Sequence, residues 1–70
     1  MKSIQEFDEA WRNAGKHRRY TVVLGDGSSI YVSKHEVFDY PETVVTNVNL
    51  FLKGEWIATV PLASIKGVMA

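Results

Sequence analysis

The sequence predicts a mainly β fold: a small closed barrel of four to five antiparallel strands, preceded by one α-helix. Three observations carry this prediction: a capped amphipathic segment over residues 3–14, two-residue alternation of apolar side chains from residue 20 onward, and glycine-containing turns between the alternating segments. The 70 residues suit one domain, 1–70. Closing the strands into a barrel removes exposed sheet edges. The alternative is an open α+β sheet with the helix packed on one face.

The first segment predicts a helix over residues 3–14. Ser3 and Glu6 have the spacing of a capping box, in which each side chain bonds a free backbone N–H at the helix start. Apolar residues recur at three- and four-residue steps and form a stripe that includes Phe7 and Trp11. Gly15 suits the left-handed conformation that ends a helix. We expect the apolar stripe to cover the strands.

Residues 20–33 predict a β-hairpin, because apolar side chains alternate on both sides of Gly25-Asp26-Gly27. A three-residue loop with Gly27 left-handed would place Val22 opposite Ile30 and Tyr20 opposite Val32. That register gathers apolar side chains on one face, whereas a two-residue Asp26-Gly27 turn would mix them with polar ones. We therefore expect the three-residue loop.

Residues 34–42 are predicted to form a loop with one helical turn at most. Ser33 and Glu36 repeat the capping-box spacing, which favours a turn of helix. Pro41 disfavours the helical conformation at Tyr40 and limits its length.

A second hairpin over residues 43–60 and a turn with a short strand over 61–69 complete the prediction. Thr43–Leu52 is rich in Val and Thr, with Asn47 and Asn49 marking a solvent-exposed face. Lys53-Gly54-Glu55 predicts the turn, and Pro61 should end the following strand. Residues 62–65 suit a 3₁₀ turn.

The composition excludes several classes of protein. Eight basic and eight acidic residues give a formal net charge of zero, which argues against a strongly basic nucleic-acid coat and against an acidic DNA mimic. The chain has no cysteine and no apolar run of about 18 residues, so we expect a cytoplasmic protein without membrane contact. His17 and His35 lack metal-ligand spacing. No metal, cofactor or catalytic residue is predicted, and the protein is expected not to be an enzyme.

A basic connector defines one candidate site. Lys16, Arg18 and Arg19 precede Tyr20, and Tyr31 lies on the neighbouring predicted strand. Cations beside exposed aromatic rings suit single-stranded nucleic acid, because they neutralise phosphate and offer a stacking surface. The alternative is a solubilising connector whose cations lie favourably near the C-terminus of the helix.

Aromatic and apolar side chains define a second candidate site, for a protein partner. Phe38 and Tyr40 lie in an acidic loop, and large aromatic residues on loops are frequent at interfaces. Only Lys53, Glu55 and Lys66 are charged between residues 43 and 70. A small barrel cannot enclose every apolar side chain of this segment, so we expect some to be exposed. The expected partner-binding residues are Phe38, Tyr40, Phe51, Trp56 and Ile57, and the expected partner is a second copy in a homodimer or a host protein.

The pattern Tyr20-x-Val22-x-Leu24-x-Asp26-Gly27, Gly54-Glu55 and Val60-Pro61-Leu62-Ala63-x-Ile65 resembles small, uncharacterised SH3-like barrel proteins of phages, prophages and bacteria. The resemblance covers residues 20–68 and implies an accessory or host-interaction protein encoded by a phage or prophage, with no catalytic residues. The segment Val37-Phe38-Asp39-Tyr40 is also similar to the acidic, aromatic ligand-binding loop of SH3 domains, although here it follows the first hairpin.

Overall fold

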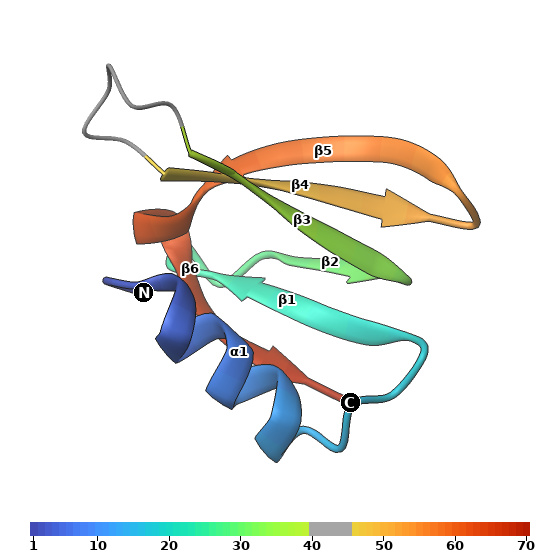
Figure 1. Ribbon diagram of the computed structural model, residues 1–70, viewed down its shortest axis with the longest axis horizontal. Coiled ribbons are helices and arrows are strands. Elements are labelled where there is room, and N and C mark those ends of the chain that lie inside the picture. Colours follow the sequence, from blue (N-terminus) through green and yellow to red (C-terminus); the bar gives the residue numbers. More distant parts are fainter. Residues whose placement is uncertain (40–45) are drawn as a thin grey trace.

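The structure is a computed structural model that describes residues 1–39 and 46–70 (Figure 1). It confirms a mainly β fold with one N-terminal helix. The elements are α1 (Ile4–Asn13), β1 (Tyr20–Leu24), β2 (Ser29–Val32), β3 (Lys34–Asp39), β4 (Thr46–Leu52), β5 (Glu55–Pro61), the 3₁₀ helix η1 (Leu62–Ser64) and β6 (Ile65–Met69).

The strands form two antiparallel sheets, ordered β2-β1-β6 and β3-β4-β5. In Figure 1 the two sheets lie as layers, and α1 runs beside β1 and β6. Only Ser33 separates β2 from β3, and only η1 separates β5 from β6, so the chain passes directly from one sheet to the other at both places. This arrangement is the small SH3-like barrel expected from the sequence. The strands number six because the bend at Ser33 divides one long strand in two.

The helix and the first hairpin agree with their predictions. The Ser3 hydroxyl accepts a hydrogen bond from the Glu6 amide at 3.2 Å, and Gly15 has a φ of 100°. In the hairpin, Val22 pairs with Ile30 and Tyr20 with Val32. Gly27 has a φ of 90°, and the Leu24 amide donates to the Ser28 carbonyl across the three-residue loop.

The loop and helical turn predicted for residues 34–42 are wrong over residues 34–39, which form β3. The physical reason lies in Ser33, whose side chain does not cap a turn. Its hydroxyl accepts from the Lys53 amide at 3.1 Å and donates to the Phe51 carbonyl at 3.3 Å, both on the second hairpin. Residues 40–42 of the predicted loop, and residues 43–45 of the predicted strand, lie outside the described residues.

The second hairpin turns at Lys53 and Gly54, whose φ values of 54° and 81° are those of a two-residue type I′ turn. On β4, Val48 and Leu50 are buried as the alternation predicts, while Asn49 is not. The predicted 3₁₀ turn and last strand are confirmed as η1 and β6.

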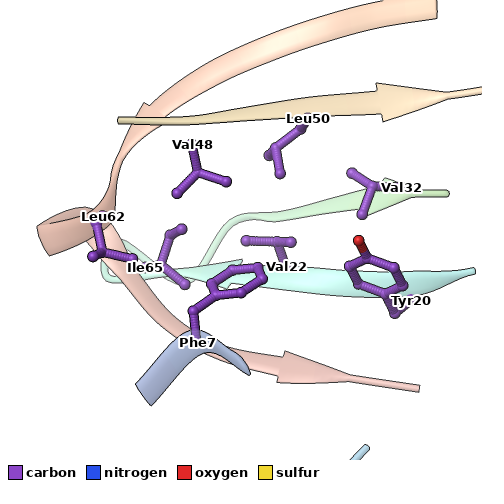
Figure 2. Packing of buried hydrophobic residues seen from close by; sticks show 8 residues of the cluster. All are labelled: Phe7, Tyr20, Val22, Val32, Val48, Leu50, Leu62 and Ile65. Carbon is purple, nitrogen blue, oxygen red and sulfur yellow. The ribbon is translucent and has the colours of Figure 1, made fainter. Parts of the chain in front are cut away.

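The core lies between the two sheets, where fully or nearly fully buried side chains from both sheets, α1 and η1 meet (Figure 2). They are Phe7, Tyr20, Val22, Val32, Val48, Leu50, Leu62 and Ile65. Phe7 is the member that α1 contributes, and Figure 2 shows its ring between the side chains of Ile65 and Tyr20. Through Phe7 the helix therefore contributes to the core of the barrel.

We predict that Phe7→Ala lowers the free energy of unfolding by about 3–5 kcal/mol, the usual cost of a cavity left by a buried aromatic ring. Domains of this size have little more stability than that, so most of the variant should be unfolded at 37 °C. Urea denaturation followed by circular dichroism measures the loss. Gln5→Ala, at an exposed position of the same helix, is the control and should change the free energy by about 0.5 kcal/mol or less. Equal stability of the two variants would contradict the docking of α1.

Candidate interaction surface

The outer face of the β3-β4-β5 sheet carries the largest exposed aromatic side chain of the described residues. Strand register places Lys34 opposite Phe51, and Phe51 opposite Trp56, so these three share one row. Trp56 is 65% exposed, and the Lys34 ammonium lies 5.5 Å from the centre of the Phe51 ring. The row ends at the β4–β5 turn, so the aromatic pair lies at the tip of the hairpin.

A β-bulge at Ile57 shapes this tip. Leu50 pairs with Ala58 and Phe51 pairs with Trp56, which leaves Ile57 without a register partner on β4. Its side chain is 44% exposed. A bulge adds one residue to one strand and increases the local twist. The ladder therefore does not require Ile57.

Hydrogen bonds fix the orientation of Trp56. Its indole Nε1 donates to the Thr59 hydroxyl at 2.9 Å, and that hydroxyl donates to the Asn49 amide oxygen at 2.6 Å. Residues three apart in a regular strand point to opposite faces, so Trp56 can reach Thr59 because the bulge lies between them. The exposed ring is thus held in one orientation, which lowers the entropy cost of burying it against a partner.

The structure brings together three of the five predicted partner-binding residues. Phe51, Trp56 and Ile57 gather at the hairpin tip, with Lys53 in the turn and Glu55 at the start of β5. We call these five residues the tip patch. The backbone of Phe38 pairs with Asn47 on the same sheet, and Tyr40 lies outside the described residues. The expectation of exposed apolar residues in the C-terminal segment holds for Trp56, Ile57 and Met69, whereas Phe51 is half-buried and Leu62 is buried.

Tyr31 lies on the other sheet, and the basic connector joins α1 to that sheet. Lys16, Arg18 and Arg19 are exposed and lead into β1. Tyr31 is 51% exposed and pairs with Thr21, which in turn pairs with Met69 on β6. Tyr31 therefore belongs to the outer face of the β2-β1-β6 sheet, and the basic connector leads into the first residue of that sheet's central strand.

The fold also assembles a polar line that the sequence did not indicate, from α1, β1 and β3. The Tyr20 hydroxyl lies 2.5 Å from Nδ1 of His35, and Nε2 of His35 lies 3.9 Å from a carboxylate oxygen of Asp8. Phe7 and Trp11 pack against the imidazole, with ring centres 4.5 and 5.5 Å away. A proton on Nε2 would face the Asp8 carboxylate and leave Nδ1 to accept from Tyr20, so we assign that tautomer.

Burial governs the titration of Tyr20 and His35. It raises the pKa of Tyr20 to about 12 and lowers the pKa of His35, the nearby Asp8 carboxylate opposing the latter shift only in part. Tyr20 is 2% exposed, so its hydroxyl is closed to a substrate. A carboxylate, an imidazole and a hydroxyl arranged in this order can serve nucleophilic chemistry when the hydroxyl is accessible. Here the three side chains join α1 to the two sheets.

Within residues 1–39 and 46–70, no group of three or more acidic or histidine side chains is placed to hold a metal ion. Within the same ranges, no helix has both the length and the apolarity to cross a membrane.

Comparison of the chain with models of protein families, with curated proteins and with solved structures found no match. The fold is thus described by its own topology, as a helix-capped β barrel with an aromatic hairpin tip.

We predict that the protein loses stability as the pH falls below about 6.5, the ordinary pKa of an unfolded histidine. Because the folded-state pKa of His35 is lowered, the unfolded chain binds more protons between the two pKa values. The contribution of His35 is complete above the unfolded pKa and is lost as the pH falls through the folded one. Urea denaturation between pH 4.5 and 8 measures the slope.

His35→Gln should flatten that slope. His17→Gln, which replaces an exposed imidazole in the connector, should keep it and serves as the control. An unchanged slope in the His35 variant would show that other groups cause the pH dependence.

Proposed function

We propose that the protein is a non-enzymatic interaction protein that associates with a second copy of itself through the tip patch. The observation that carries the proposal is the exposed and oriented indole of Trp56 beside Ile57, on a strand whose one charged residue is Glu55. Aromatic side chains held in one orientation are typical anchors of protein interfaces.

The contact is assigned to side chains at the tip and not to the free backbone edge of β5. This strand pairs only with β4 among the described residues, so one edge is open. However, the bulge at Ile57 and the missing N–H of Pro61 interrupt the edge at both ends, and both are devices that discourage strand addition. A packed apolar contact does not need an unbroken edge.

The charges of the turn favour a second copy as the partner. Lys53 and Glu55 flank Gly54, so the tip carries one charge of each sign. In a two-fold symmetric dimer the same patch is used twice, and Lys53 of one copy can lie opposite Glu55 of the other. A self-complementary patch of this kind suits a homodimer. The resemblance to phage and prophage barrel proteins supports an accessory role, in which a host protein would be the alternative occupant of the same patch.

We predict a mass near twice 7.9 kDa by light scattering at high micromolar concentration. Ile57→Lys should shift the mass toward the monomer, because it places a charge within the apolar contact without disturbing the ladder. Met69→Lys alters an exposed apolar residue on the other sheet and should leave the dimer intact. A monomeric wild-type protein would refute self-association and leave the host protein as the candidate.

The charges give a test that separates a second copy from an unrelated partner. Lys53→Glu makes both tip charges negative, and Glu55→Lys makes both positive. Each variant alone should dimerise more weakly than the wild type, and an equimolar mixture should recover the dimer mass by light scattering at low salt. Recovery on mixing requires the two tips to face each other, so its absence would contradict the two-fold arrangement.

A further inference from the structure

The outer face of the β2-β1-β6 sheet differs in charge from the rest of the molecule. Its three strands contain no carboxylate, and their one charged residue is Lys66. The other sheet carries Lys34, Glu36, Asp39 and Glu55 on its described strands. Although the net charge of the chain is zero, the strands of this sheet carry one positive charge and those of the other sheet carry more negative than positive charges.

The basic connector extends this face at the end where β1 begins and β6 finishes (Figure 1). Lys16, Arg18 and Arg19 are exposed, and none lies within 4.0 Å of a described carboxylate oxygen. Within the β1–β2 hairpin the one acidic residue is Asp26. It lies at the opposite end, where its carboxylate accepts hydrogen bonds from the Ser28 amide and hydroxyl at 2.9 and 2.6 Å.

Tyr31 lies on this face near the C-terminal end of the basic connector. It pairs with Thr21, which follows Arg19 by two residues. Steps of about 3.8 Å along the chain and about 5 Å between paired strands put the Cα atoms of Arg19 and Tyr31 on the order of 10 Å apart. Its ring is half exposed and lies in a row with Thr21 and the exposed Met69.

We infer that this face binds single-stranded nucleic acid, with the connector neutralising phosphates while Tyr31 stacks on a base. An exposed aromatic ring near exposed cations that pair with no described carboxylate is the combination that single strands require. Duplex DNA is disfavoured because the face presents neither a helix nor a protruding β-ribbon to enter a groove. The surface is separate from the tip patch, so this inference does not depend on self-association.

The test measures binding of fluorescein-labelled oligo(dT) and oligo(U), each about 15 nucleotides long, by fluorescence anisotropy at 50 mM salt. We expect micromolar binding that weakens steeply between about 50 and 200 mM salt. Arg18→Ala with Arg19→Ala should weaken binding and reduce the salt slope. Tyr31→Ala should weaken it about five- to 150-fold, the effect of losing one stacked base at ~1–3 kcal/mol.

The controls separate stacking from general attraction to a polyanion. Val37→Ala removes an exposed apolar side chain of the other sheet, outside the tip patch, and should leave the affinity unchanged. Heparin should bind without sensitivity to Tyr31→Ala, because a sulfated sugar offers no base to stack. The inference is overturned if the oligonucleotides do not bind at 50 mM salt with tens of micromolar protein. It is equally overturned if Tyr31→Ala leaves their affinity unchanged, or if Val37→Ala lowers it as much.

Discussion

The bend at Ser33 is the constraint on which the rest of the structure depends. At this residue one long strand leaves the first sheet and enters the second, and the Ser33 amide donates to the Phe51 carbonyl at 2.7 Å. Its hydroxyl also accepts from the Lys53 amide. One residue thereby lets a short chain surround a core with two sheets, and it holds the start of β3 against the turn that bears the tip patch. The position of the candidate interface follows from the same hydrogen bonds that close the barrel.

How far the sequence predicts this fold depends on whether each signal is local. Ser3 and Glu6 cap α1, and Gly27 sets the first hairpin, because those contacts are made within a few residues. The same capping spacing at Ser33 and Glu36 misled the prediction, since Ser33 turns to Lys53, which is distant in sequence. In β3 the side chain that shares a row with Leu50 is His35, and a polar residue in that place hides the alternation of a strand.

The candidate sites were also predictable from the sequence only where the signal is local or compositional. Depletion of charge after residue 43 was enough to predict exposure of Trp56 and Ile57. The bulge between them, and the hydrogen bonds from Trp56 to Thr59 and on to Asn49, depend on the register of two strands and could not be predicted from composition. The line from Asp8 through His35 to Tyr20 joins three elements and becomes visible only when they are packed. Its residues lie far apart in the sequence and match no motif.

The bulge at Ile57 has a consequence for variation of the chain by insertion or deletion. Without residue 57, the pairs Phe51–Trp56 and Leu50–Ala58 would become consecutive steps of a regular ladder, and each remaining side chain would keep its face. A chain one residue shorter here could fold in the same register. Loss of any other single residue from the paired part of β5 would instead change the alternation of its neighbours. Position 57 can therefore be lost, gained or altered with little effect on the register of β4 and β5.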